Sequence, residues 1–147
     1  MSSQITLTLL QESLSGDIGS DWKYQLKADL IDPLVFGSGL IEVSEHLLRP
    51  GATQAPPEST HPITLAAGDC GAETRLRLTL EATEVDWLID DNASNVSMIT
   101  VRCPAPGAEP TVAEHEVAAR VREAPGFQGG LAVLKLKVRV VAECVGG

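Results

Sequence analysis

Acidic side chains gather in two segments of this sequence, residues 17–24 and residues 84–95, which also contain glycine, serine and asparagine. Calcium is a hard cation that takes six to eight oxygen ligands, largely from carboxylates and carbonyls. If the two segments are loops at the same end of a fold, their carboxylates could bind one ion together. The alternative is structural, because Asp, Asn, Gly and Ser also form ordinary turns.

Basic side chains alternate with apolar ones in three further segments. Their spacing places them on one face of each predicted strand: Lys135, Lys137 and Arg139 on one, Arg75 and Arg77 on another, and Lys23 and Lys27 on a third. If these strands are neighbours, an acidic protein carries a basic stripe that could contact a partner. The alternative is the solvated outer face of a sheet, neutralised by acidic residues across the strands.

The two tryptophans, Trp22 and Trp87, each follow an aspartate. A tryptophan at the edge of a loop can bind a partner by burying its ring in the interface. The alternative is that both rings cap the ends of the core. Aromatic residues make up only 3% of the chain, so the core has few large side chains to spare, and the core interpretation is favoured.

No pattern typical of an active site accompanies these residues. The sequence lacks a G-x-S-x-G nucleophile motif, a phosphate-binding P-loop, an H-E-x-x-H motif and paired zinc-ligand spacing. His46, His61 and His115 are isolated along the chain. A nucleophilic pair of Cys70 and His61 stays open, since catalytic partners are neighbours in space, and a buried free thiol is the alternative. The sequence predicts a protein that is not an enzyme and requires no cofactor, with Ca²⁺ as the one candidate ligand.

Alternation of apolar and polar residues predicts the elements that position these groups. It is clearest over residues 5–9, 22–30, 75–82 and 134–140, and weaker over 63–66 and 96–103. Residues 40–48 and 112–123 fit a strand or a short helix, with a strand favoured. Turn-forming residues separate the segments. The predicted fold class is all-β: a two-sheet antiparallel β-sandwich of about seven to nine strands, C2-like or immunoglobulin-like. A single domain over residues 1–147 is expected.

Residues 17–26 resemble the first calcium loop and following strand of the C2 family of calcium- and lipid-binding β-sandwiches. In that family an Asp, a Gly and a Ser-Asp pair precede an aromatic residue. Residues 84–95 resemble its third loop, which carries several Asp residues after a strand. Three departures are a shorter first loop, Trp22 where the family has proline, and the lack of a regular Asp-x-Asp pair in the second segment. The resemblance implies a basic strand face that meets acidic lipid headgroups, and calcium ligands at Asp17, Asp21, Asp86, Asp90 and Asp91.

Charge and cysteine spacing limit the partners and the compartment. The net charge of −9 argues against nucleic acid, and against anionic lipid unless bound calcium reverses the field. Cys70, Cys103 and Cys144 show no C-x-x-C spacing, which favours free thiols in a reducing compartment, with one disulfide and a spare thiol as the alternative. The N-terminus lacks a basic region followed by an apolar run, so a cytoplasmic location is predicted.

Together these features predict a non-enzymatic binding or assembly module that contacts a protein partner through a loop edge or a strand face. One alternative is a calcium-dependent, C2-like binder of lipid or protein. Another uses Gly146 and Gly147, because a terminal Gly-Gly is the chemistry of ubiquitin-like modifiers, in which only glycine passes without steric conflict. The oligomeric state stays open.

Overall fold

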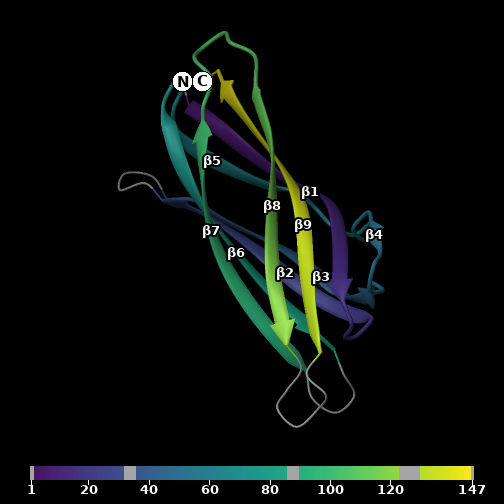
Figure 1. The fold of residues 1–147 in the computed structure, drawn as a ribbon. Coiled ribbons are helices and arrows are strands. Elements are labelled where there is room, and N and C mark those ends of the chain that lie inside the picture. The colour runs from purple at the N-terminus through teal and green to yellow at the C-terminus, as the bar shows by residue number, and fades with distance from the viewer. Residues whose placement is uncertain (1, 32–35, 86–89, 123–129, 147) are drawn as a thin grey trace.

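The alternating segments all form strands. The computed structural model describes residues 2–31, 36–85, 90–122 and 130–146, and these residues contain nine strands and no helix. Two antiparallel sheets pack face to face (Figure 1), so the predicted all-β sandwich is confirmed. The strands are β1 (Ser2–Gly16), β2 (Asp21–Ile31), β3 (Ser38–Leu47), β4 (Thr53–Gln54), β5 (Ile63–Asp69), β6 (Glu73–Glu84), β7 (Asp91–Arg102), β8 (Thr111–Arg122) and β9 (Leu131–Val145).

The two ambiguous segments are both strands, because β3 covers most of residues 40–48 and β8 covers most of residues 112–123. Sheet A has the order β4-β1-β9-β8, and β5 also pairs with β1. Sheet B has the order β3-β2-β6-β7. The edge strands β7 and β8 therefore belong to different sheets, yet they lie on the same side of the sandwich (Figure 1). No described helix is long and apolar enough to cross a membrane.

The core lies between the sheets and consists of the apolar half of each alternation. Leu76 and Leu78 of β6 and Leu136 and Val138 of β9 are at most 1% exposed, as the alternation predicts. Buried apolar residues from both sheets form one cluster. At roughly 25 cal/mol per Å² of apolar surface removed from water, this burial is the main force that holds the two sheets together.

A β-bulge in β1 reverses which residues face inward. Leu7 and Leu9 point into the core, and the pairing with β9 then shifts between Leu9 and Gln11. Beyond the shift the buried positions are Glu12 and Leu14. Because one extra residue moves every later side chain to the opposite face, a glutamate enters the interior.

Candidate functional site

The two acidic segments lie at the same end of the sandwich. The amide of Val85 donates a hydrogen bond to the carbonyl of Asp21 at 2.8 Å. Gly19, with a φ of +63°, lies so close to Glu84 that a Cβ on it would come 2.2 Å from the Glu84 Cγ. The start of β9 is at this end too, because the Leu131 amide donates to the Asp17 Oδ1 at 2.9 Å. Residues that follow β1, that follow β6 and that begin β9 therefore lie close together here.

This convergence does not assemble a metal centre from the described residues. Asp17, Asp21 and Asp90 are exposed, and Asp91 is buried opposite Glu84. Nowhere in the described ranges do three or more His, Cys, Asp or Glu side chains gather closely enough to hold an ion. Asp86, the fifth predicted ligand, lies outside the described residues. The calcium site therefore stays a prediction.

The structure bears on the prediction for Trp22 but not on the one for Trp87. Trp22 is completely buried, on the inward face of β2, and its Nε1 has no hydrogen-bond partner among the described residues. The core interpretation of Trp22 is confirmed and its predicted contact with a partner is wrong, because a ring that fills the space between the sheets reaches no surface. Trp87 lies outside the described residues.

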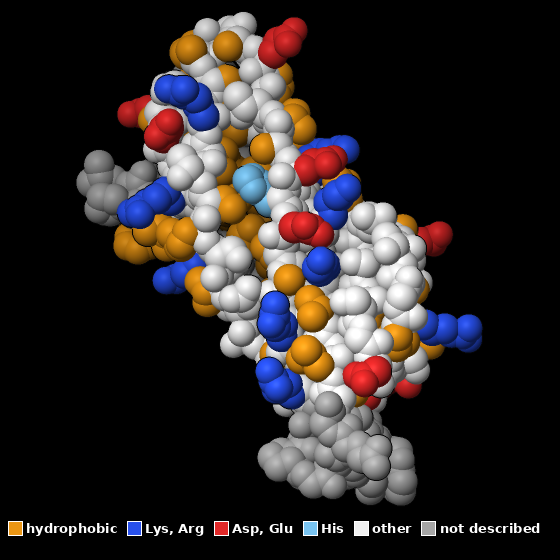
Figure 2. All heavy atoms as spheres, viewed as in Figure 1, with side chains coloured by type: hydrophobic (Ala, Val, Ile, Leu, Met, Phe, Trp, Pro, Cys, Tyr) orange, Lys and Arg blue, Asp and Glu red, His pale blue; other side chains and the backbone are white. Residues whose placement is uncertain are grey.

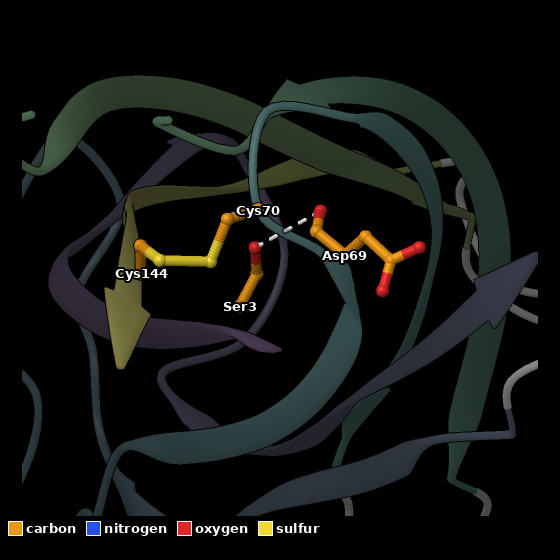
Figure 3. Close-up of a disulfide and its surroundings, with 4 residues drawn as sticks. All are labelled: Ser3, Asp69, Cys70 and Cys144. Atoms are coloured by element: carbon orange, nitrogen blue, oxygen red, sulfur yellow. Dashed lines mark hydrogen bonds between the residues drawn. A yellow bond between two sulfur atoms is a disulfide. The ribbon is translucent and has the colours of Figure 1, made fainter. Parts of the chain in front are cut away.

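A disulfide replaces the predicted free thiols. Cys70, in the turn between β5 and β6, is bonded to Cys144 near the end of β9, and their Cα atoms are 5.4 Å apart (Figure 3). Only Cys103 remains free, and it is buried. The prediction of three free thiols is therefore wrong, because the fold brings together two cysteines separated by 74 residues. A bonded Cys70 also offers no thiolate to pair with His61.

This bond changes what the cysteines indicate about the compartment. Structural disulfides persist in oxidising environments and are rare where thiols are kept reduced. The cysteine content therefore no longer supports the cytoplasmic prediction. Beside the bond, the Ser3 hydroxyl donates to the carbonyl of Asp69 at 3.4 Å (Figure 3), so the turn is also held to the start of β1.

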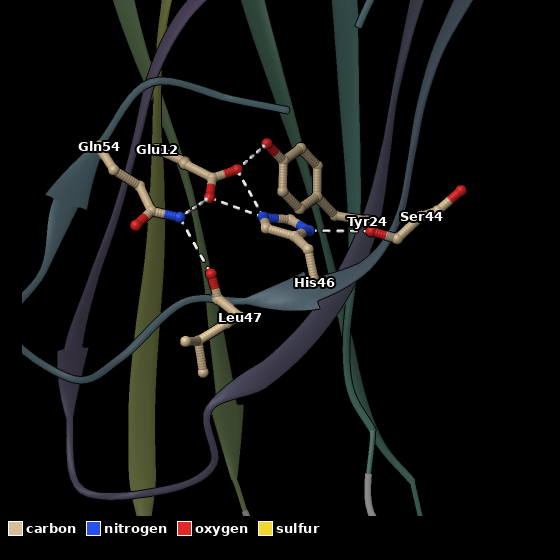
Figure 4. Close-up of polar contacts among 6 residues, drawn as sticks. All are labelled: Glu12, Tyr24, Ser44, His46, Leu47 and Gln54. Carbon is tan, nitrogen blue, oxygen red and sulfur yellow. Dashed lines mark hydrogen bonds and ion pairs between the residues drawn. The ribbon is translucent and has the colours of Figure 1, made fainter. Parts of the chain in front are cut away.

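The inward-facing Glu12 forms a polar network that was not predicted (Figure 4). Its carboxylate accepts hydrogen bonds from the Tyr24 hydroxyl at 2.6 Å and from the Gln54 Nε2 at 2.8 Å. The Nε2 of His46 lies 2.6 Å from one of its oxygens and 2.9 Å from the other. The four residues come from β1, β2, β3 and β4, so the network joins the two sheets through side chains.

The geometry of His46 defines the proton arrangement. A backbone carbonyl can only accept, so the Nδ1 that lies 2.8 Å from the Ser44 carbonyl carries a hydrogen. Nε2 then shares a proton with Glu12. Burial, followed by the hydrogen bond to Glu12 and its negative charge, raises the pKa of Tyr24 far above its usual range. Tyr24 therefore stays a donor.

Most of this network is shielded from solvent, although Gln54 is exposed. The Glu12 side chain is fully buried and that of His46 is only 17% exposed, and both ring nitrogens of His46 already have partners. The arrangement is that of a satisfied polar network within a core.

The outer face of sheet B carries a shallow hollow of about 390 Å³ above the register shift between β2 and β3. Its side chains mix both signs of charge, with Lys23 beside Glu42 and Glu81. The Gln25 Nε2 donates to Glu81 at 2.6 Å. Because this bond engages two of the lining side chains and both signs of charge line the hollow, its chemistry indicates no particular class of ligand.

The predicted basic residues lie on opposite outer faces of the sandwich and form no single stripe. Arg75 and Arg77 on β6 and Lys23 and Lys27 on β2 belong to sheet B, whereas Lys135, Lys137 and Arg139 are on β9 in sheet A. Sheet B balances its charges: Arg77 pairs with Asp29 at 3.5 Å, and Lys27 lies 3.9 Å from the same carboxylate. The prediction of one continuous basic stripe is therefore wrong, and the basic residues form two separate surfaces.

The outer face of sheet A is the more basic surface. Two arginines of β8 extend the β9 set, because their positions opposite Val133 and Leu131 place them on the same face. We call this set the basic face: Arg120, Arg122, Lys135, Lys137 and Arg139. The neighbouring β1 residues opposite the three β9 members are Ser13, Gln11 and Thr8, which carry no charge.

Few acidic residues offset the basic face. Glu114 and Glu116 lie opposite Arg139 and Lys137 on β8, and one ion pair forms, between Arg139 and Glu114 at 3.4 Å. No ion pair joins the other four basic side chains to a residue of the described chain. Figure 2 shows Lys and Arg side chains along the lower half of the face where β8 and β9 lie in Figure 1.

Arg120 and Arg122 were missed as contact residues because their segment fitted a helix as well as a strand. The signal that could have identified them is the alternation with Val117, Ala119 and Val121, which are all buried.

Comparison with known proteins adds no functional assignment. No protein-family model matches the chain, and no curated protein matches it significantly.

Proposed function

We propose that this chain is a non-enzymatic binding module that contacts an acidic segment of a protein partner through the basic face. The observation that carries the proposal is the concentration of five cations on two strands of a chain with a net charge of −9. Four of the five have no ion pair within the described structure. Unneutralised surface charge of this kind attracts a partner of opposite sign and orients it.

The structural position of the basic face supports a binding role. The strands that carry it are held from behind by fully buried residues of β9, such as Leu134 and Leu136. A strand within a sheet already has an ordered backbone, so binding there avoids the cost of ordering a loop. The absence of charge on the facing part of β1 leaves room for an extended acidic segment beside β9.

The test is binding of a short fluorescent polyglutamate peptide, measured by fluorescence polarisation at low salt. Reversing two charges with Lys135→Glu and Lys137→Glu is expected to weaken binding by at least about tenfold, which corresponds to about 1.4 kcal/mol. Added salt is expected to weaken the wild-type interaction, because exposed charges are screened within about 10 Å at 0.1 M.

The matched control reverses Arg75 and Arg77 to Glu on the opposite sheet, which also removes two exposed cations from one strand. The proposal predicts that this variant binds like the wild type. Equal losses in both variants would show that only net charge matters and would overturn the proposal. Equal binding of single-stranded DNA and of the peptide would also contradict a protein partner.

A calcium-dependent, C2-like binder is the second candidate, favoured by the meeting of the two acidic segments at one end of the sandwich. Asp17 and Asp21 are both exposed there, where an ion could reach them. Such an ion would also be the condition for binding acidic lipid.

Melting temperature in millimolar calcium tests this second candidate. Ligand bound only to the native state stabilises it, by about 2.7 kcal/mol at a hundred times the dissociation constant. We expect calcium to raise the melting temperature, and we expect the double variant Asp17→Asn with Asp21→Asn to abolish this rise. An equal melting temperature in calcium and in chelator excludes the site.

A modifier role for Gly146 and Gly147 has less support, because strand pairing extends to Val145 and Cys144 is bonded.

A further inference from the structure

The edge strand β7 lacks the features that keep most exposed strands from pairing. Sheet B ends at β7, which pairs with β6 along its whole length without a register shift. The ten residues between Asp91 and Arg102 include no charged residue and no proline. A regular, uncharged edge exposes unpaired amides and carbonyls, and it can template the addition of another strand.

The other long edge strands in the described chain are protected. On the opposite edge of sheet B, β3 carries Glu42 and Glu45 and has a register shift against β2. In sheet A, β8 carries four charged residues on its outer face, and the strands on the other side of β1 are short, with two residues in β4 and seven in β5. β7 is therefore the exception among these strands.

Apolar side chains on the outer face of β7 are also exposed. Val96 is 56% exposed and Met98 is 50% exposed, and they lie two residues apart on the same face. Figure 2 shows hydrophobic side chains at the surface on the side of the molecule where β7 lies in Figure 1. A pairing strand would remove these side chains partly from water.

We propose that β7 pairs antiparallel with β7 of a second copy of this chain, so that two B sheets join into one. In an antiparallel pair, side chains directly opposite each other lie on the same face of the sheet. A two-fold axis that passes beside Val96, perpendicular to the sheet, gives such a pairing. Val96 then lies opposite its own copy, and Met98 lies opposite Ser94. Arg102 comes opposite Asp90 of the other copy, so the basic end of each strand meets the acidic start of its neighbour.

We infer that the strand added to β7 comes from a second copy of this chain, because β7 is complementary to itself. Its charges lie only at its two ends, with opposite signs, and its exposed apolar residues lie near its middle. Antiparallel pairing about the middle satisfies both features at once, as a two-fold interface requires.

The rest of the described fold adds no strand to the outer edge of β7. The neighbouring β8 belongs to the other sheet and has no strand pairing with β7. Hydrogen bonds nevertheless join the two strands: the Asn95 Nδ2 donates to the Ala118 carbonyl at 2.7 Å, and the Thr111 Oγ1 donates to the Arg102 carbonyl at 2.8 Å. Asn95 has the inward parity of Ala93 and Val101, and Thr111 and Arg102 lie at one end of their strands, so the middle of β7 around Val96 pairs with β6 alone among the described strands. The basic face, on the outer side of sheet A, stays open in the dimer.

Sedimentation velocity over a range of concentrations tests the proposal. The wild type is expected to shift from monomer to dimer as concentration rises, and Val96→Lys with Met98→Lys is expected to weaken dimerisation at least about tenfold, since like charges then face each other across the axis. The matched control is Val112→Lys at the edge strand β8, where the valine is 61% exposed, and it should dimerise like the wild type.

Cross-linking tests the register. In a background of Cys103→Ser, Val96→Cys places two thiols at the axis, where opposite Cα atoms about 4.5–5.5 Å apart suit a disulfide. Mild oxidation is expected to give a covalent dimer with Val96→Cys and none with Val112→Cys. A wild type that sediments as a monomer up to its solubility limit overturns the proposal. So does a dimer that both lysine variants leave unchanged.

Discussion

Glu12 is the residue whose environment departs most from its ordinary preference, because charged side chains are rarely fully buried. Three side chains from three other strands satisfy its carboxylate. Breaking a buried pair leaves an uncompensated charge or an unsatisfied donor, and this costs much more than an exposed pair contributes. The network should therefore stabilise the contact between the two sheets at this edge.

Glu12→Gln is expected to lower the free energy of unfolding by about 3 kcal/mol, at the lower end of values for breaking a buried pair. The amide keeps the size of the side chain but cannot accept from His46, Tyr24 and Gln54 together. Urea denaturation measures the change. Glu116→Gln, an exposed position on β8, is the control and should change stability by less than about 0.5 kcal/mol. A similar small change in both variants would show that the network contributes little.

At the scale of the elements, the strands differ in how they treat their outer faces. β9 and β8 concentrate cations, Lys27 of β2 and Arg77 of β6 share the carboxylate of Asp29, and β7 carries no cation between its ends. Since each of these strands turns its other face toward the same core, the outer face is where they can differ in function. This difference is why we assign partner binding to β8 and β9 and self-pairing to β7.

At the scale of the whole molecule, the Cys70–Cys144 bond ties the last strand to the connection between the two sheets. The turn that holds Cys70 leads from β5 of sheet A to β6 of sheet B. The bond closes a loop of 74 residues. A cross-link over such a length restricts the unfolded chain strongly and stabilises the native state by typically about 2–4 kcal/mol.

Replacing both bonded cysteines with serine should therefore lower the melting temperature. A loss of about 2–4 kcal/mol is expected if the constraint on the unfolded chain dominates. Calorimetry with and without a reductant provides the check: reductant should destabilise the wild type and leave the double serine variant unchanged. A wild type that melts at the same temperature in both conditions would show that the bond is absent in solution or without energetic effect.

The strands and the sandwich could be predicted from sequence because burial of a half-exposed strand depends on alternation, which is local. Leu76, Leu78, Leu136 and Val138 all face the core as their spacing indicates. The ambiguity of residues 112–123 had a physical origin too, since alanine, valine and paired charges suit an amphipathic helix as well as a strand. The segment forms a strand because this places Val117, Ala119 and Val121 together on the buried face.

By itself, the sequence determined that strands with one apolar face must form and that their polar faces must meet water. It also determined which of these faces carry the cations. Only the tertiary structure decided which strands are neighbours, and this placed Arg75 and Lys135 on opposite sides of the molecule. A single bulge in β1 turned Glu12 inward, and the pairing of β9 with β1 and β5 with β1 brought Cys144 to Cys70. Such contacts depend on strand register and topology. Because these bring together residues that are far apart in the chain, no local sequence pattern predicts them.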